Sequence, residues 1–319
     1  MRKRFLTTAG AVTAAFSAVL AIGVVPATAN DEKPRGEAPR VMIYTGTTGF
    51  RHADAINNGR PVVQAALEQA GYTVDWEDCN DNGGNPGNCD HPTENQRVFN
   101  DGNLTRYDAV LLFNASASWA GGGKPGPLWD ERQRAAIIRF VQRGGGIAAN
   151  HNATDMGAGV VSWDWWDGGD QSVVGTLMRG HARTDRTNVA DVHVEDPDHL
   201  STLTLPPVYG FGDEHYNFAR SVRGTHHVLL TLDEASYDPG GNAMGADHPI
   251  TWCKRYDGAR VVDGTGVAKP YRDGRTWVTG MGHFGASYTE RGGDNELVRQ
   301  IVGGVRWVAG EGHRSDCAT

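Results

Sequence analysis

Histidine and carboxylate side chains occur beside glycines in several separate segments of this chain. An imidazole titrates near neutral pH, so it can exchange a proton with a substrate or, when neutral, bind a metal ion. One segment, Gly144–Asp155, begins with a glycine turn and a short apolar run and ends in polar residues. The others are Gly49-Phe50-Arg51-His52, Arg179-Gly180-His181, Asp213-Glu214-His215-Tyr216 and Gly280-Met281-Gly282-His283. Together they predict a polar pocket that is formed by several loops.

The residues around His151 have the pattern of a buried parallel strand with polar side chains at its carboxyl end. Open α/β sheets bind their ligands at that end. His151 is therefore predicted to exchange protons with a substrate hydroxyl or an enolisable carbon, or to bind a metal. A buried histidine that hydrogen-bonds only to backbone groups is the structural alternative. Asn152 and Asp155 are predicted to contact the substrate.

His52 follows the first apolar run through Gly49, and Arg51 beside it suits an anionic or hydroxyl-rich ligand. Both are predicted to bind substrate, although His52 alternatively caps the following helix. Asp213 and Glu214 are adjacent, so in an extended segment only one of them enters the pocket. Tyr216 is predicted to donate its hydroxyl to a substrate oxygen or to fill the core.

His181 and His283 each follow a glycine, which permits close backbone approach, and both are candidate metal ligands. A structural hydrogen bond is the alternative for each of them. Three imidazoles and a carboxylate would be an ordinary zinc set. The chain has no H-x-x-x-H or H-E-x-x-H spacing, so a metal site requires convergence of distant loops. The cofactor is therefore left open, with a divalent metal such as zinc as one candidate.

The elements that must position these residues alternate between strands and helices. Strands are predicted at 40–46, 72–76 and 107–114 and after the turn at 144–146, with helices at 58–71 and 128–143. The second half is less regular, with strands predicted at 189–194, 226–232 and 276–280 and a closing helix at 295–308. This alternation predicts an α/β fold with a doubly wound, mainly parallel sheet, helices on both faces and long loops.

The first thirty residues predict export. A basic start (Arg2, Lys3, Arg4), an apolar run and the small residues Ala27-Thr28-Ala29 indicate a signal peptide over residues 1–29, with a membrane anchor as the alternative. A disordered leader at 30–39, one domain at 40–310 and a tail at 311–319 complete the expected organisation. Removal of the signal changes the formal net charge from −8 to −11, with 27 basic against 38 acidic residues. Such an acidic protein is not expected to bind nucleic acid or an anionic membrane.

Four cysteines in an exported chain favour two disulfides, for which three connectivities exist. Cys79 and Cys89 flank a turn-rich loop that a local bridge would close. Cys253 with Cys317 would then tie the tail to the body of the protein. There is no C-x2-C pattern, so a cysteine zinc site is not expected.

Several of these motifs resemble, in order, the ThuA-like (trehalose-utilisation) family, whose fold belongs with the class I glutamine amidotransferase-like, flavodoxin-like domains. The resemblance covers residues 40–310 and rests on Thr48–His52, Gly144–Asp155, Gly180-His181, Asp213–Tyr216, Pro249–Trp252, Gly274-Arg275, Gly282-His283 and Trp307–Gly310. It implies a flavodoxin-like α/β fold and favours Glu214 as the carboxylate that enters the pocket. Because the family is associated with disaccharides and oxidised keto-sugars, the resemblance also implies a role in carbohydrate processing.

Amidotransferases of this fold carry a nucleophilic cysteine in a strained turn between strand and helix. Ala149-Asn150-His151-Asn152 matches that turn here and contains no cysteine or serine, so glutamine hydrolysis is not expected. The loop from Cys79 to Cys89 and the cluster Trp163–Trp166 are additions to the family pattern. Trp163 is predicted to stack on a sugar ring, with packing under a loop as the alternative.

These observations predict a secreted carbohydrate-active enzyme of hydrolase, lyase or isomerase type. His151 and Glu214 are its expected proton-transfer residues, and a small saccharide or a polysaccharide is its expected substrate. A non-catalytic secreted carbohydrate-binding protein is the main alternative. An amidase or peptidase would require a free cysteine in the pocket. The oligomeric state is left open.

Overall fold

The computed structural model describes residues 37–79, 94–117, 128–156, 166, 172–262, 268–312 and 317, with the backbone alone at 257–262 and 268–271. Residues 38–319 belong to one compact unit. The predicted signal peptide, Cys89 and Trp163 lie outside the described residues, as does most of the predicted leader. Within the described part of the chain, no helix has the length and apolar composition that a bilayer span requires.

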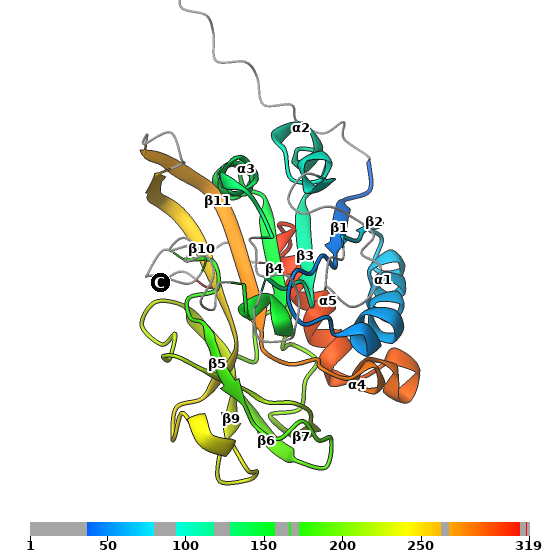
Figure 1. Ribbon diagram of the computed structural model, residues 1–319, viewed down its shortest axis with the longest axis vertical. Coiled ribbons are helices and arrows are strands. Elements are labelled where there is room, and N and C mark those ends of the chain that lie inside the picture. The colour runs from blue at the N-terminus through cyan, green and yellow to red at the C-terminus, as the bar shows by residue number, and fades with distance from the viewer. Residues whose placement is uncertain are drawn as a thin grey trace, which may run out of the picture. The chain divides into compact units, whose positions relative to one another are not determined.

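Five parallel strands form one half of the main sheet (Figure 1). They pair in the order β2-β1-β3-β4-β11, which is the strand order of flavodoxin-like folds. The predicted α/β fold with parallel strands is therefore confirmed. Their bounds are β1 Arg40–Tyr44, β2 Thr73–Glu77, β3 Ala109–Phe113, β4 Gly146–Asn150 and β11 Ala268–Thr279.

Four antiparallel strands extend this sheet from β11 in the order β10-β9-β6-β7. Their bounds are β6 Val189–Val194, β7 Val208–Gly212, β9 His227–Asp233 and β10 Pro249–Val262. The sequence pattern predicted β6 and β9 but not β7 or β10. A separate antiparallel pair, β5 Met178–His181 and β8 Tyr216–Phe218, lies beside the extension and was also not predicted.

Helices cover both faces of the parallel half (Figure 1). Side chains alternate between the two faces of a strand, so two neighbouring residues of β4 show which helix covers each face of the sheet. Gly146 abuts Val308 of α5, whereas Ile147 lies with Ile137 and Phe140 of α3. The helices are α1 Arg60–Gln69, α2 Asp101–Leu104, α3 Glu131–Gln142, α4 Gly285–Thr289 and α5 Glu296–Val308. Helix α1 packs against α5, and α2 against α3.

The helix ends follow from capping residues. Asp130 begins α3 with a reciprocal capping box: its side chain accepts from the Gln133 N–H, and Gln133 accepts from the Asp130 N–H. Asn295 caps α5 in the usual way, with its side chain accepting from the Val298 N–H. The predicted helix at 58–71 is a π-helical turn, η1 Ala55–Gly59, followed by α1. Short 3₁₀ turns complete the structure: η2 Glu94–Arg97, η3 His151–Thr154, η5 Gly240–Asn242 and η6 Glu290–Gly293.

Cys253 on β10 and Cys317 near the C-terminus form a disulfide with a Cα–Cα distance of 5.7 Å. Cys79 is also disulfide-bonded, and its expected partner, Cys89, lies outside the described residues. None of the cysteines that the structure describes is a free thiol. Those cysteines therefore supply no nucleophile of the kind an amidase would need.

Candidate functional site

Loops at the carboxyl edge of the parallel strands bring three histidines together. His52 follows β1, His151 follows β4, and His283 follows β11. In flavodoxin-like folds, ligands bind at this edge of the sheet. Glu214 joins the three imidazoles from the segment between β7 and β8, so the antiparallel half supplies the carboxylate.

His151 occupies a strained backbone position at the end of β4. Its φ is 48°, in the left-handed region that side chains other than glycine rarely adopt. Its Nδ1 lies 2.7 Å from the carbonyl oxygen of Gly280. A carbonyl only accepts, so Nδ1 carries a hydrogen, and Nε2 faces the cluster. The strained turn predicted from Ala149-Asn150-His151-Asn152 is therefore present.

A buried hydrogen-bond network supports this turn. Asn150 donates from Nδ2 to the carbonyl of Met281, over 2.7 Å. The Tyr288 hydroxyl lies 3.0 Å from Asn150 Oδ1 and 2.8 Å from the Gly282 carbonyl. These bonds connect the end of β4 to the loop after β11, and they fix His151 relative to His283.

Asp213 and Glu214 perform different tasks, as their opposite directions predicted. Asp213 accepts a 2.6 Å hydrogen bond from the backbone N–H of Gly282, and its carboxylate also faces the N–H of His283 at 3.2 Å. Glu214 instead contacts imidazoles. Its Oε2 lies 2.9 Å from His283 Nδ1, 3.5 Å from His151 Nε2 and 3.9 Å from His52 Nε2.

Electrostatics favour an ionised Glu214 and a neutral His52. Burial acts to raise the pKa of Glu214, but contacts with the three imidazoles outweigh it and hold that pKa well below its usual range. Burial lowers the pKa of His52 to about 3, against the opposing effect of Glu214. The rings of His52 and His151 meet edge to face, with centroids 4.8 Å apart.

Several buried imidazole nitrogens have no hydrogen-bond partner among the described residues. In the cluster these are both ring nitrogens of His52 and Nε2 of His151, and elsewhere they are Nε2 of His199 and Nδ1 of His215. A buried polar atom without a partner costs about 1–3 kcal/mol, so such atoms are uncommon in folded proteins. The convergence of His52 and His151 on one carboxylate distinguishes this cluster from histidines that serve only the core.

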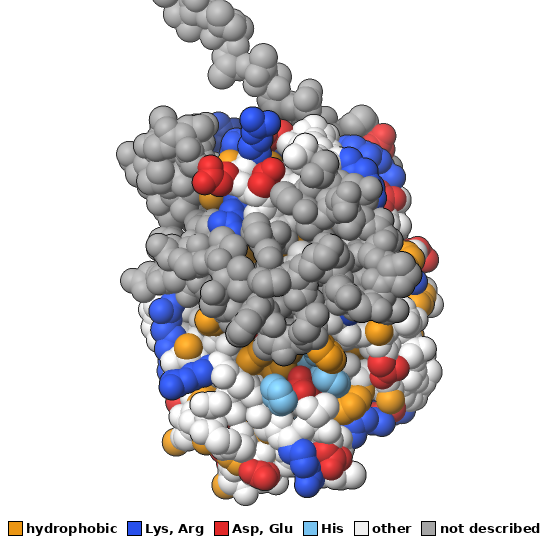
Figure 2. Space-filling view, in the orientation of Figure 1, with side chains coloured by type: hydrophobic (Ala, Val, Ile, Leu, Met, Phe, Trp, Pro, Cys, Tyr) orange, Lys and Arg blue, Asp and Glu red, His pale blue; other side chains and the backbone are white. Residues whose placement is uncertain are grey.

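A pocket of about 370 Å³ opens above the cluster. Figure 2 shows histidine side chains on either side of an acidic one at the surface, next to hydrophobic side chains. Tyr216 forms part of the pocket and stacks on His151, with ring centroids 3.9 Å apart. The pocket is lined by Phe50, His52, Asn152, Asp155, Met178, His181, Thr184, Glu214, Tyr216 and His283.

Most of the predicted site residues that the structure describes line this pocket, but His151 and Arg51 do not. His151 is fully buried behind the lining, against Glu214 and Tyr216. The Arg51 guanidinium turns to β2 and the segment after it, and binds the Asp78 carboxylate at 2.9 and 3.0 Å and the Thr45 carbonyl at 3.0 Å. The structure therefore places Arg51 outside the pocket, with its charge paired with a carboxylate 27 residues away, and its role in substrate binding stays a prediction.

His181 lies at the mouth of the pocket rather than in the cluster. Its side chain is 45% exposed, and its Nδ1 lies 2.8 Å from the Ala182 carbonyl and 3.3 Å from Glu214 Oε1. The residues whose donor atoms converge are His52, His151, Glu214 and His283. His52, predicted to bind substrate, thus takes the place in the cluster that the sequence assigned to His181.

Thr184 is a pocket residue that the sequence analysis missed. Its hydroxyl donates to Glu214 Oε1. The only signal was its position three residues after His181, which does not separate it from an ordinary loop threonine. Phe50 was quoted within a motif but received no role, yet its ring is 47% exposed at the pocket.

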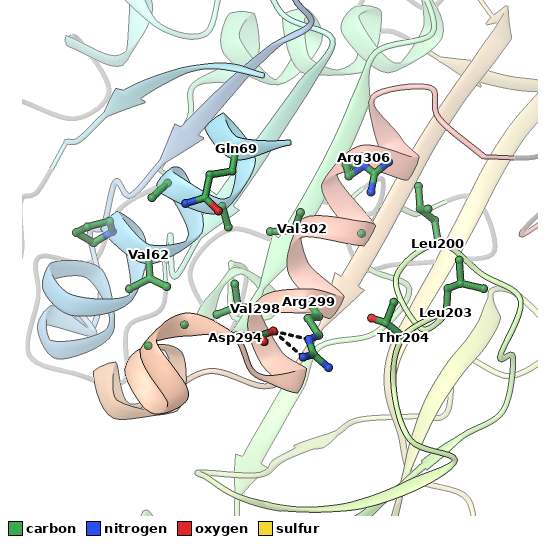
Figure 3. A pocket seen from close by; sticks show the side chains of 16 residues that line it. Val62, Gln69, Leu200, Leu203, Thr204, Asp294, Val298, Arg299, Val302 and Arg306 are labelled. Carbon is green, nitrogen blue, oxygen red and sulfur yellow. Dashed lines mark hydrogen bonds and ion pairs between the residues drawn. The ribbon is translucent and has the colours of Figure 1, made fainter. Parts of the chain in front are cut away.

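A larger groove of about 660 Å³ lies between α1, α5 and the turn at 200–204 (Figure 3). Val62 and Gln69 line it from α1, and Leu203 from the turn. Its charged side chains are paired, as in the 2.6 Å contact of Arg299 with Asp294. Among the described residues that line it there is no histidine or cysteine. The smaller pocket therefore has the side chains suited to chemistry.

Comparisons with known proteins agree with this architecture. Residues 40–308 match the family model ThuA, described as trehalose utilisation. A ThuA-like protein from Bacteroides uniformis has a similar structure, with a TM-score of 0.59 and 18% identity over 87% of this chain and 94% of the other. A ThuA-like protein from Parabacteroides merdae gives a TM-score of 0.54 and 16% identity over 88% and 97%. At these identities the structures establish the fold alone. No curated protein matched the chain.

Proposed function

Because this chain belongs to the trehalose utilisation (ThuA) family, we propose that it is a secreted enzyme that acts on a carbohydrate in the pocket around His151. The observation that carries the proposal is the convergence of His52, His151, Glu214 and His283 at the base of that pocket. The family supplies the link to sugars, and the cluster supplies groups that transfer protons.

The pocket has the dimensions and lining that a small saccharide needs. Its volume of about 370 Å³ lies within the range of small-molecule sites, about 300–1,000 Å³. Asn152, Asp155 and Thr184 offer amide, carboxylate and hydroxyl groups for sugar hydroxyls. Phe50 offers an exposed aromatic face on which the apolar side of a sugar ring can stack.

Proton transfer is the chemistry that the cluster supports. His151 Nε2 presents a lone pair, because Nδ1 is committed to the Gly280 carbonyl. A base in this position accepts a proton from a substrate hydroxyl or from a carbon next to a carbonyl. Glu214 remains ionised and stabilises the imidazolium that results. Cleavage or rearrangement of a glycoside or keto-sugar is the corresponding reaction class.

A substrate screen tests this proposal. The mature protein is incubated with plain and oxidised disaccharides, and products are followed by chromatography. Turnover of at least one sugar is expected. His151→Ala should lose this turnover, whereas His193→Ala, which changes an exposed histidine of β6, should retain it. Saccharide affinity without any product would instead indicate a non-catalytic carbohydrate-binding protein.

Secretion is tested separately. Amino-terminal sequencing of the protein recovered from culture medium is expected to begin at Asn30. Retention of the whole product in the cell, with Met1 still present, would contradict export.

A further inference from the structure

We propose that His52, His151, Glu214 and His283 bind one divalent first-row transition-metal ion at the base of the pocket, with Zn²⁺ as the representative ion. This inference deepens the proposed function, and it rests on that function only for the role of the ion in turnover. Three imidazoles and one carboxylate form a nitrogen and oxygen donor set that suits this class of cation.

The distances between the donors fit a common ion. Ligands at about 2.0–2.1 Å from a tetrahedral centre are about 3.4 Å from one another. Glu214 Oε2 lies 2.9, 3.5 and 3.9 Å from the nearest nitrogens of His283, His151 and His52. These separations bracket the tetrahedral value, so small side-chain rotations suffice to place all four donors around one centre.

The unpaired nitrogens are the second line of evidence. Nε2 of His151 and both ring nitrogens of His52 are buried without a hydrogen-bond partner among the described residues. A divalent cation would give Nε2 of His151 and one nitrogen of His52 a bonding partner and would neutralise the carboxylate.

Neighbouring groups already orient the donors as they do around protein-bound metals. A ligating histidine commonly donates its other N–H to a backbone carbonyl, as His151 does to Gly280. Thr184 donates to Oε1 of Glu214, which leaves Oε2 directed at the imidazoles. Asp213 fixes the backbone of His283.

The second cluster of candidate ligands in the described residues offers too few free donors. It contains His199, Cys253 and Cys317, but the two sulfurs are joined in a disulfide and offer no thiolate. The ion would therefore be expected only at the pocket. With the ion bound, His151 would be a ligand instead of a base, and the ion would act as a Lewis acid toward a sugar oxygen that binds as a fifth ligand.

Metal analysis of the tag-free mature protein tests the proposal without reference to turnover. Elemental analysis is expected to find about one equivalent of a first-row metal. After chelation, titration with Zn²⁺ by calorimetry should show one site, and Co²⁺ should give the visible absorption of a nitrogen- and oxygen-bound ion. Glu214→Gln and His283→Gln are expected to weaken Zn²⁺ binding by at least about 100-fold. His227→Gln, at a surface histidine paired with Asp196, should bind as the unmodified protein does.

Thermal unfolding of each metal-free variant checks that it remains folded. The proposal is overturned if the stripped protein binds none of the metals tested, or if folded Glu214→Gln and His283→Gln both retain full affinity. Stoichiometric metal with no turnover of any sugar would support the site and reject the proposed function. Turnover that survives complete chelation would support the proposed function and reject a role for the ion in it.

Discussion

Asp213 holds His283 through the backbone: its carboxylate accepts a 2.6 Å hydrogen bond from the Gly282 N–H and lies 3.2 Å from the His283 N–H. The adjacent Glu214 contacts the His283 side chain at 2.9 Å. One acidic pair therefore fixes both the main chain and the imidazole of the same residue. The first prediction follows from this arrangement.

Asp213→Asn is expected to lower the free energy of unfolding by about 1–3 kcal/mol. The amide retains one acceptor oxygen but directs an NH₂ group at backbone donors in a buried position. Urea denaturation measures the change. Asp191→Asn, at an exposed position of β6, serves as the control and should change stability little. Equal stability of the two variants would show that the Asp213 hydrogen bonds are dispensable.

The strained backbone of His151 predicts a difference between two substitutions. A left-handed conformation costs an L-residue about 1–2 kcal/mol, whereas glycine adopts it readily. At a φ of 48°, His151→Gly is therefore expected to be about 1 kcal/mol more stable than His151→Ala. Both variants lose the imidazole and should lose turnover. A more stable alanine variant in urea denaturation would argue against strain at this turn.

Burial of His226 predicts a loss of stability in mild acid. Burial lowers its pKa to about 3, and nearby Lys254 also disfavours the cation. Between about pH 6.5 and pH 3 the unfolded chain binds a proton that the folded protein does not, so stability is full above 6.5 and falls as the pH falls. At pH 5 the free energy of unfolding is expected to be about 2 kcal/mol lower than above pH 6.5 because of this group.

Denaturation of His226→Gln between pH 5 and 8 checks this prediction. The variant cannot bind that proton, so its stability should depend less on pH than that of the unmodified protein. His193→Gln, at an exposed position of β6, is the control and should retain the original dependence. Identical pH profiles for the two variants would contradict a role for His226.

Helix α5 approaches β11 so closely that Gly304 cannot carry a side chain. A Cβ at this position would lie 2.3 Å from the ring of Trp277. Helix propensity alone favours alanine over glycine by about 1 kcal/mol. Gly304→Ala is nevertheless expected to destabilise the protein by about 1–3 kcal/mol through overpacking. Gly102→Ala in α2, where the nearest atom is 3.4 Å away, should be neutral or stabilising in the same urea assay.

Much of the parallel half of the fold could be predicted from the sequence because β1, β3 and β4 are buried on both faces. Met42 and Leu111, for example, belong to continuous apolar runs. The antiparallel extension was less visible. β7 carries two glycines in five residues, and β10 interrupts its apolar residues with Lys254 and Arg255. Its pairing depends on distant strands that a local pattern does not reveal.

The candidate site was predictable in its members but not in its geometry. Residue type and position after glycines or strands singled out His52, His151, Glu214 and His283. Their separations depend on where four loops meet, and the exclusion of Arg51 depends on Asp78 arriving from another strand. Such contacts are set by tertiary packing, so the sequence alone could not show that His52 lies in the cluster and His181 at the mouth of the pocket.

The division of the sheet into two halves has a consequence for how relatives can diverge. Three imidazoles are anchored to the rigid parallel strands, whereas Glu214, Tyr216, Thr184 and Met178 belong to the antiparallel half or its neighbouring pair. Exchange of residues 178–218 between two homologues would thus transplant one wall of the cavity while leaving the imidazoles in place. Ligand preference would then follow the exchanged segment, whereas reactivity would also require that segment to supply a carboxylate at the position of Glu214.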